Sequence, residues 1–476
     1  MALPVVGVVG AGTMGAGIAA VAALAGHEVR LYDADPAGTA AGLVTISKAV
    51  ASNERRGHIT GAEASAARER VRPATSLDDL ADAGLVIEAI VESLPVKRDV
   101  FAALEAVVAP DAILATNTSS LSITDLAAGL ARPERVVGMH FFNPPTVLPL
   151  VEVVSGESTE PAIADAVFDL AAAWGKTPVH ATSTPGFIVN RVARPYYNEP
   201  FAAYEAGIAE PATIDAVLRD GAGFRMGPFE LTDLIGHDVN SAVSTSVWEA
   251  FDRDPRFTPS TAQRELVAAG RLGRKTGQGW FAYDADGKPL AQERPHATPP
   301  VSGRTLPLGV LPSGGGSLML TRGLTAADES QLAGGHVLLV DLADTAGASA
   351  AGLAVPSDCP DGVQVEAVAV LNGAGLRVLE LADVPGLVAA RTVAMLVNLA
   401  ADAVDAGVAT ATDVDLAMVK GVNYPRGPLE WGDLLGPAYV VQLLDTLAAS
   451  PLPEAARRYR VSPWLRERAE RGEQLR

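Results

Sequence analysis

The chain has 476 residues, too many for one hydrophobic core at roughly 100–200 residues per domain, so we expect about three folding units. Its 37 lysines and arginines are outnumbered by 56 aspartates and glutamates, and the net charge of −19 argues against a nucleic-acid partner. The single cysteine, Cys359, excludes an internal disulfide and a cysteine-rich metal cluster, and we expect no metal site. Because the net charge is strongly negative, an anionic ligand needs a local basic patch.

Residues 5–26 carry no charged side chain and are long enough to cross a membrane. Six glycines interrupt this stretch, and no basic segment precedes it as a secretory signal requires. We therefore expect a soluble, cytoplasmic protein that does not span a membrane.

The first chemical motif lies between a predicted strand and a predicted helix. Residues 5–9 form a short β-branched run, and residues 14–25 are rich in Ala, Leu and Ile. The turn between them reads GAGTMG and fits the dinucleotide-binding fingerprint: Gly10 permits the tight turn, Gly12 lets a pyrophosphate approach the backbone, and Gly15 lets the helix pack against the strand. The phosphates then lie at the helix N-terminus, where free N–H groups and the helix dipole favour negative charge.

A second strand-like run, residues 28–32, ends in Asp33, at about the 20-residue spacing that such a site requires. A carboxylate at this point accepts hydrogen bonds from the ribose hydroxyls and repels a 2′-phosphate, so we expect NAD rather than NADP as the cofactor. The alternative role for Asp33 is a strand-end cap.

Further strand patterns follow at residues 85–89, 112–116, 136–139 and 150–154, with helical patterns between the earlier ones. This alternation predicts an α/β fold that begins with a Rossmann-type, doubly wound parallel sheet. Ligands of such sheets bind beyond the carboxyl ends of the strands. Polar segments lie at those ends, namely EAIVE (88–92), NTSSL (117–121) and HFFNP (140–144).

His140 and Glu152 are the candidate proton-transfer pair. His140 follows an apolar run and is expected at a strand end, whereas Glu152 lies in the apolar residues 148–154, where a carboxylate without a partner is costly. Pairing with His140 satisfies the carboxylate, fixes the imidazole tautomer and makes the ring a base that holds a proton. This is the proton-transfer half of alcohol oxidation, in which a nicotinamide takes the hydride. Separate structural roles for the two residues are the alternative.

The motifs together resemble the signature series of the L-3-hydroxyacyl-CoA dehydrogenases, in order, over residues 1 to about 284. To the segments above the series adds GFIVNR (186–191) and GRKTG (273–277). The long chain is similar to the 3-hydroxybutyryl-CoA or 3-hydroxyadipyl-CoA type of bacterial butyrate, fatty acid or phenylacetate metabolism.

The resemblance implies an NAD-dependent enzyme that oxidises a 3-hydroxyacyl-CoA to the 3-oxoacyl-CoA. It implies that His140 is the catalytic base, that Glu152 orients it, and that Ser119 and Asn190 bind and polarise the substrate's oxygens. It also implies that the cofactor is contacted or bordered by Asp33, Glu92, Lys97, Ser119, Asn143 and Lys275. For the two lysines, a solvated surface position is the alternative.

The CoA contacts of the family come from a helical segment after the second strand, and here the basic positions do not align cleanly. Lys48, Arg55 and Arg56 are the candidates for the CoA phosphates, with a solvated helix end as the alternative.

The later chain contains an internal repeat. Residues 185–236 lie over residues 385–436 at a constant offset of 200, with 16 identities in 52 positions, which we interpret as a duplicated helical domain. Asn190 corresponds to Ala390, so the second copy is not expected to form an active site. In the family this domain forms the dimer contact, so the resemblance implies an intrachain pseudo-dimer, with any further homo-oligomer left open.

The predicted domains are an NAD-binding domain at 1–184, helical copy 1 at 185–284, a linker and small α/β unit at 285–384, and degenerate helical copy 2 at 385–476. Pro195 and Pro200 are expected to kink or break the first helix of copy 1. Residues 289–317 are typical of a linker, and residues 335–341, 363–371 and 376–381 predict strands of the small unit.

Two other functions remain open from the sequence. One is a β-hydroxyacid dehydrogenase that acts on a free acid with a lysine for proton transfer, which has no need of a His140 and Glu152 pair. The other is a non-catalytic dinucleotide-binding relative.

Overall fold

The computed structural model describes residues 4–290, 306–344 and 347–476, so residues 291–305 of the predicted linker lie outside the described residues. The chain divides into two compact units. Unit 1 comprises Met1–Val189 and Gly407–Val422, and unit 2 comprises Asn190–Ala406 and Asn423–Arg476. In the described ranges, no helix is long and apolar enough to cross a membrane.

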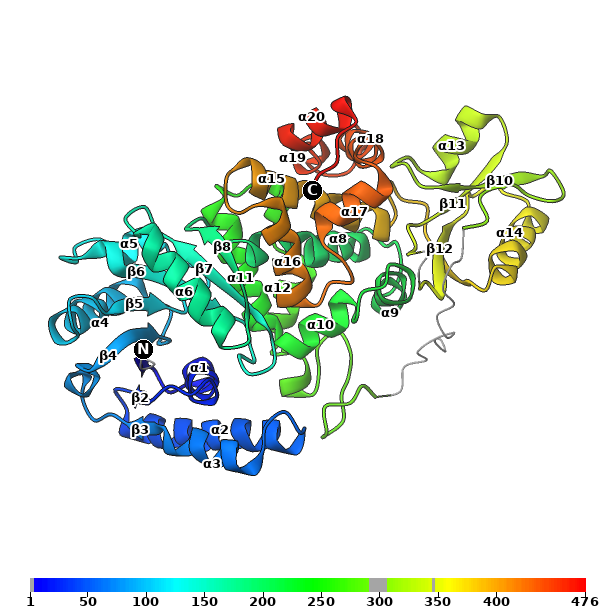
Figure 1. Ribbon diagram of the computed structural model, residues 1–476. Coiled ribbons are helices and arrows are strands. Elements are labelled where there is room, and N and C mark those ends of the chain that lie inside the picture. Colours follow the sequence, from blue (N-terminus) through cyan, green and yellow to red (C-terminus); the bar gives the residue numbers. More distant parts are fainter. Residues whose placement is uncertain (1–3, 291–305, 345–346) are drawn as a thin grey trace. The chain divides into compact units, whose positions relative to one another are not determined.

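Unit 1 is built on an eight-stranded sheet with the strand order β3-β2-β1-β4-β5-β6-β7-β8 (Figure 1). Its strands are β1 Val5–Val9, β2 Val29–Tyr32, β3 Val71–Pro73, β4 Ala83–Glu88, β5 Ile113–Thr116, β6 Val136–Phe141, β7 Leu150–Ser155 and β8 Thr177–Thr182. The predicted Rossmann-type α/β fold is confirmed, although β3 and β8 were not predicted from the sequence.

The neighbouring strands of this sheet are parallel except β6 and β7, which are antiparallel, so the prediction of a wholly parallel sheet is wrong at this point. The connection between these two strands, residues 142–149, is too short for the crossover helix that a parallel pair needs. The reversal places His140 directly opposite Glu152 in the register of the two strands.

The helices of unit 1 are α1 Thr13–Leu24, α2 Pro36–Arg55, α3 Gly61–Glu69, α4 Leu94–Val107, α5 Ile123–Ala127, α6 Pro161–Ala173 and, from the second helical copy, α16 Ala411–Val422. The small side chains of α1 let it pack closely on the sheet, and the helix is buried from Gly15 to Ala23. Its core partners include Val6, Val8 and Leu31, all fully buried. α1 is therefore held rigidly behind the glycine turn that precedes it.

Unit 2 is mainly helical. Its helices are α8 Arg194–Glu205, α9 Pro211–Ala216, α10 Pro228–Ile235, α11 His237–Ala250, α12 Thr261–Ala268, α15 Ala389–Asp405, α17 Pro428–Leu435, α18 Pro437–Ala448, α19 Ala455–Arg458 and α20 Pro463–Arg471. The short helix α7, Val189–Val192, precedes α8, and the helical run is interrupted at Ala193. Pro195 lies in the first turn of α8, where its missing N–H costs nothing, so the helix begins just before this proline. Pro200 lies inside α8 and does not end the helix.

The two helical copies contact one another inside unit 2, where α15 packs against α8. The contact is polar as well as apolar, because Arg391 Nε of α15 lies 2.9 Å from Glu199 Oε2 of α8 and both side chains are buried. Arg458 and Tyr459 also bind the Glu199 carboxylate. A buried charge network thus joins the copies.

Unit 2 also contains a five-stranded sheet with the order β13-β12-β11-β10-β9. Its strands are β9 Gly309–Val310, β10 Gly316–Leu320, β11 His336–Val340, β12 Ala350–Ala354 and β13 Arg377–Leu381, and two helices accompany them, α13 Ala326–Ala333 and α14 Asp361–Gly373. The strands predicted at 335–341 and 376–381 are confirmed.

The strand predicted at residues 363–371 is wrong, because this segment lies in helix α14. Its β-branched residues suggested a strand, but Val363, Ala367 and Leu371 recur every four residues and are the buried positions. Val365, between them, is 67% exposed, which the period of a helix explains.

Candidate active site

The glycine turn between β1 and α1 has the shape of a phosphate cradle. Gly10 has a φ of 100°, and a Cβ there would lie 2.5 Å from the Ala89 carbonyl oxygen. A Cβ on Gly15 would lie 1.8 Å from the Gly10 carbonyl oxygen, whereas one on Gly12 meets no described atom within 4 Å. The turn is therefore closed on its inner side and open at Gly12. No side chain of the described residues caps the N-terminus of α1, so the residues present fit a dinucleotide pyrophosphate.

Asp33 lies beside this turn, directly after β2. Its Oδ2 accepts a hydrogen bond from the Ala11 N–H at 2.7 Å, and its Oδ1 accepts one from the Asp35 N–H at 3.0 Å. The capping role considered from the sequence is therefore present. The side chain is only half-buried, and the same bonds fix the carboxylate next to the phosphate cradle.

Lys97 is a buried cation between two glutamates, so the alternative of a solvated surface lysine is wrong for it. Its Nζ lies 2.6 Å from Glu88 Oε1 and 3.3 Å from Glu92 Oε2. Glu92 Oε1 also accepts hydrogen bonds from Thr118 Oγ1 at 2.6 Å and from the Ser119 N–H at 3.2 Å. Burial raises the pKa of Glu92, but the Thr118 hydroxyl and the Lys97 charge outweigh it, and the net shift is downward. An ionised carboxylate thus ties Lys97 to the loop that carries Ser119.

His140 and Glu152 form a direct pair across β6 and β7. His140 Nδ1 lies 2.6 Å from Glu152 Oε2, and the other carboxylate oxygen accepts the Ile188 and Val189 N–H groups at 3.0 Å each. Glu152 is fully buried and His140 is 5% exposed. Within the described residues, Nε2 of His140 has no hydrogen-bond partner. His140 is the fifth of the six residues of β6 and so lies at the carboxyl end of this strand, as expected from the sequence.

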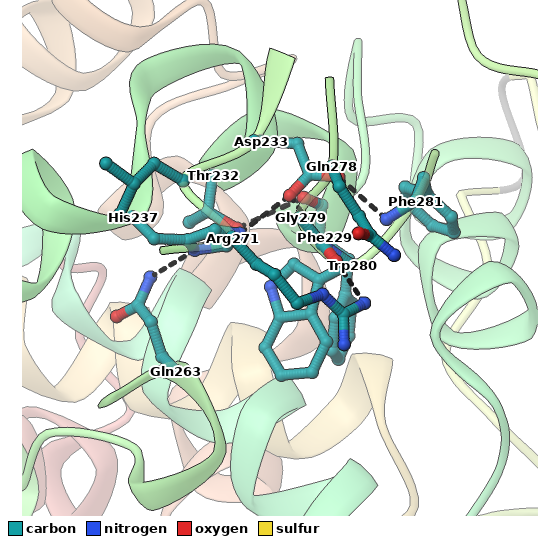
Figure 2. Close-up of polar contacts among 12 residues, drawn as sticks. Phe229, Thr232, Asp233, His237, Gln263, Arg271, Gln278, Gly279, Trp280 and Phe281 are labelled. Atoms are coloured by element: carbon teal, nitrogen blue, oxygen red, sulfur yellow. Dashed lines mark hydrogen bonds and ion pairs between the residues drawn. The ribbon is translucent and has the colours of Figure 1, made fainter. Parts of the chain in front are cut away.

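A second histidine–carboxylate pair lies in unit 2, and sequence reasoning did not single it out (Figure 2). His237 Nε2 lies 2.6 Å from Asp233 Oδ1, and its Nδ1 lies 3.2 Å from Gln263 Nε2. Asp233 also accepts the N–H groups of Trp280 and Phe281 at 2.9 Å each. His237 is fully buried and both its nitrogens are engaged, so this pair holds the segment after α12 in place. His140 differs from His237 because its Nε2 has no hydrogen-bond partner among the described residues.

The remaining predicted residues lie in different places. Asn190 follows Val189 directly in the chain, one residue beyond an N–H group that Glu152 binds. Asn143 is exposed in the connection between β6 and β7. Lys275 belongs to unit 2, where its Nζ pairs with Asp238 at 2.5 Å and its side chain is 44% exposed. In unit 1, the Phe141 N–H donates to Asn117 Oδ1 at 2.8 Å, which ties the start of the loop that carries Ser119 to the strand end that carries His140.

A basic groove of about 480 Å³ runs beside α2 and α3, with Lys48, Arg55 and Arg68 in its lining. Arg56, the third sequence candidate for the CoA phosphates, is exposed but does not line the groove. Arg68 was missed because it comes from α3, and only the packing of α3 on α2 brings it beside Arg55.

Three family models match the chain. Residues 5–184 match the NAD binding domain of 3-hydroxyacyl-CoA dehydrogenase. The C-terminal domain of 3-hydroxyacyl-CoA dehydrogenase matches twice, at residues 186–283 and 386–476. Residues 318–385 match the reduced Rossmann-fold domain of 3-hydroxybutyryl-CoA dehydrogenase.

Individual proteins are similar over all or part of the chain. The 3-hydroxyadipyl-CoA dehydrogenase of Escherichia coli K12 is 45% identical over 471 residues, which is 98% of this chain and 97% of that protein. A probable 3-hydroxybutyryl-CoA dehydrogenase of Bacillus subtilis is 40% identical over 277 residues, 58% of this chain and 96% of its own length. A crystal structure of 3-hydroxybutyryl-CoA dehydrogenase from Escherichia coli K12 superposes with a TM-score of 0.91 at 43% identity, covering 99% of both chains.

Proposed function

The chain belongs to the 3-hydroxyacyl-CoA dehydrogenase family and is an NAD-dependent enzyme, and we propose that it oxidises an L-3-hydroxyacyl-CoA to the 3-oxoacyl-CoA with His140 as the general base. The observation that carries the proposal is the 2.6 Å contact of His140 Nδ1 with Glu152, which leaves Nε2 open. Bound NAD supplies the acceptor for the hydride that leaves C3. The hydroxyl proton goes to Nε2 of His140, and a C3 carbonyl results.

The Glu152 carboxylate prepares His140 for this step. Because both backbone N–H groups donate to Oε1, the carboxylate is fixed and Oε2 faces the imidazole. Nδ1 therefore carries the hydrogen, and the lone pair is on Nε2. When the proton arrives, the adjacent carboxylate stabilises the imidazolium.

Ser119 and Asn190 are proposed to bind and polarise the substrate's oxygens. Support for Ser119 comes from its loop, which Glu92 holds through the Ser119 N–H and the Ser120 hydroxyl. Support for Asn190 comes from chain continuity with Val189, which is anchored to Glu152. Both are hydrogen-bonding side chains next to rigid backbone, as substrate positioning requires.

For the cofactor, we propose that Gly10, Gly12 and Gly15 hold the pyrophosphate, that Asp33 binds the ribose, and that Glu92, Lys97, Asn143 and Lys275 contact or border the dinucleotide. The buried ammonium of Lys97 is already shared by two glutamates, so we assign it to the positioning of Glu92. For CoA, we propose the groove cations Lys48 and Arg55, with Arg68 in place of Arg56.

We further propose that the buried contact of α8 with α15 replaces a dimer contact within one chain, and that the protein works in the cytoplasm. The network of Glu199, Arg391 and Arg458 supports the first point, because it is a specific polar contact between the copies. The second rests on the sequence alone.

Turnover assays test the proposal. Acetoacetyl-CoA with NADH should give turnover, whereas free acetoacetate with NADH should not; the reverse result would favour the free-acid dehydrogenase, and no turnover with either would favour a non-catalytic relative. His140→Ala should lose several orders of magnitude in kcat and still bind NADH. His180→Ala is the matched control, because the His180 side chain is 44% exposed and its Nε2 lies 3.6 Å from Asp165 Oδ1 on the surface of unit 1, away from Glu152. Equal losses in the two variants would refute the role of His140.

A further inference from the structure

Arg194, at the start of α8, is a buried cation with no carboxylate beside it among the described residues. Its Nη1 donates to Ser244 Oγ of α11 at 3.1 Å, and its guanidinium carbon lies 4.9 Å from the centre of the Tyr197 ring. The other buried arginines of the described ranges each have a carboxylate nearby, namely Glu105 for Arg135, Asp402 for Arg191 and Arg256, and Glu199 for Arg391.

The surroundings of Arg194 do not compensate for its burial. A cation–π contact and one hydrogen bond to a neutral hydroxyl return only part of the cost of removing a guanidinium from water. Burial lowers the pKa of Arg194, and the groups that oppose this shift are Tyr197 and Tyr424 rather than a carboxylate. Nε of Arg194 lacks a hydrogen-bond partner in the part of the chain that the structure describes, as do those of Arg135 and Arg191, so the missing carboxylate is what distinguishes Arg194.

Tyr424 supplies a second unsatisfied donor in the same cluster. It lies in the loop between α16 and α17, its side chain is 5% exposed, and its hydroxyl has no hydrogen-bond partner among the described residues. Its ring lies 5.5 Å from that of Tyr196 and 5.1 Å from that of Phe224. A guanidinium and a phenol are donors that suit an acceptor-only group with two oxygens, which describes a carboxylate.

The internal repeat shows that this polar cluster is one-sided. At the offset of 200, Arg194 corresponds to Ala394, Tyr197 to Val397, Ser244 to Leu444, and Tyr424 to Phe224. Every polar member is therefore apolar at the pseudo-equivalent position, where Ala390 also replaces Asn190. A packing role common to both copies does not explain this difference. The cluster occurs together with the asparagine proposed to bind substrate.

We propose that Arg194 and Tyr424 bind the terminal carboxylate of a dicarboxylic 3-hydroxyacyl-CoA, an inference that rests on the proposed function. Arg194 is four residues after Asn190 along a nearly continuous helix, a rise of about 6 Å. In a six-carbon diacid the terminal carboxyl carbon is three C–C bonds beyond C3, and bonds of about 1.5 Å give a reach of about 4 Å. When Asn190 binds an oxygen near C3 of the substrate, the terminal carboxylate of the acyl chain therefore extends about one helical turn beyond Asn190, towards Arg194.

The proposal gives the second helical copy a role in substrate choice. Tyr424 comes from that copy, whereas Arg194 comes from the first. The degenerate copy, which lacks Asn190, therefore completes the carboxylate site of the copy that retains it.

The test compares two thioesters of equal length, 3-hydroxyadipyl-CoA and 3-hydroxyhexanoyl-CoA, which differ in the terminal group. We expect the wild type to have the higher kcat/KM for the diacid. Arg194→Met should lower the ratio of the two kcat/KM values about 100-fold, the loss of a charged hydrogen bond. Tyr424→Phe introduces the residue found at position 224 and should lower the ratio about fivefold.

Controls keep the test decisive. Tyr196→Phe removes a hydroxyl of the same aromatic cluster that is engaged by the Met226 carbonyl oxygen, and it should leave the ratio at the wild-type value. If Arg194→Met does not fold, Tyr424→Phe decides. A wild-type preference for the hexanoyl thioester, or a ratio unchanged in a folded Arg194 or Tyr424 variant, overturns the inference. Absence of turnover with either thioester in the wild type refutes the proposed function instead.

Discussion

Replacing Glu152 by glutamine separates its two contacts. The amide oxygen can still accept the N–H groups of Ile188 and Val189, which now bind Oε1 at 3.0 Å. The amide NH₂ group then faces Nδ1 of His140, which must become an acceptor. The hydrogen of the neutral ring moves to Nε2, the atom that has to receive the substrate proton.

The expected loss follows from this change of tautomer. A comparable carboxylate-to-amide change beside a catalytic histidine costs about 10⁴ in kcat, so we expect a decrease of about 10³–10⁴, or about 4–5.5 kcal/mol of activation free energy. Because the hydrogen bonds from the Ile188 and Val189 N–H groups survive in Glu152→Gln, the free energy of unfolding of this variant should fall by only about 1–2 kcal/mol. Glu152→Ala leaves those N–H groups and the imidazole unpaired, and it should cost about 3–5 kcal/mol of stability.

The assay is the oxidation of NADH with saturating acetoacetyl-CoA, together with urea unfolding and NADH binding by fluorescence. The glutamine variant should bind NADH as the wild type does and turn over far more slowly. If a folded Glu152→Gln protein keeps kcat within tenfold of the wild type, Glu152 does not set the tautomer of His140 and the proposed proton path is wrong.

Three further outcomes are expected. Lys48→Glu should raise the KM for acetoacetyl-CoA about tenfold and weaken its salt dependence, whereas Arg56→Glu, just outside the groove, should not; equal effects would remove the groove from CoA binding. Asp33→Asn keeps an acceptor for the Ala11 N–H but removes the charge, so the preference for NADH over NADPH should shrink about tenfold, and an unchanged ratio of kcat/KM values would contradict the assignment. Burial lowers the pKa of Lys176 to about 8, below its ordinary 10.5, so the unfolded chain binds more protons between these pH values and stability rises with pH there. The urea midpoint of the wild type should therefore rise relative to that of Lys176→Met between pH 8 and pH 10. A constant difference between the two midpoints would show that the pKa of Lys176 is not shifted.

The sequence was sufficient wherever the signal was local. The glycine turn, Asp33 and the strands around His140 are each determined by residues close together in the chain, and the structure has these elements where the pattern predicted them, although β6 and β7 are antiparallel rather than parallel. The pairing of His140 with Glu152 was predictable because one strand connection separates them. These are the features that periodicity and turn chemistry specify.

Features that depend on distant segments were not predictable in this way. Glu92, which pairs with Lys97, is held by the Thr118 hydroxyl 26 residues further along the chain, and the partners of Arg194 come from α11 and the loop after α16. The helix α14 was mistaken for a strand because its valines match both periods over a short window.

The overlay at an offset of 200 also extends further back than the helical domain. β7 and β12 begin at Leu150 and Ala350, and α6 and α14 begin at Pro161 and Asp361. The small sheet of unit 2 is therefore a second copy of the last part of the large sheet. Its strands β11 and β12 are antiparallel, as β6 and β7 are.

This second copy separates the structural and chemical demands on Glu152. Gly352 stands at the position of Glu152. Asp341, the residue directly after β11, donates its N–H to the Gly352 carbonyl oxygen at 2.9 Å and so lies opposite Gly352, as His140 lies opposite Glu152 in the first copy. The Asp341 carboxylate accepts the N–H groups of Val388, Ala389 and Ala390 at 2.8–2.9 Å, the first two of which correspond to the groups bound by Glu152. The buried helix start thus requires a carboxylate in both copies, whichever strand provides it. Only the first copy adds an imidazole to this carboxylate. The need to satisfy the helix start explains Oε1 of Glu152, whereas the contact of Oε2 with His140 requires a further, chemical reason.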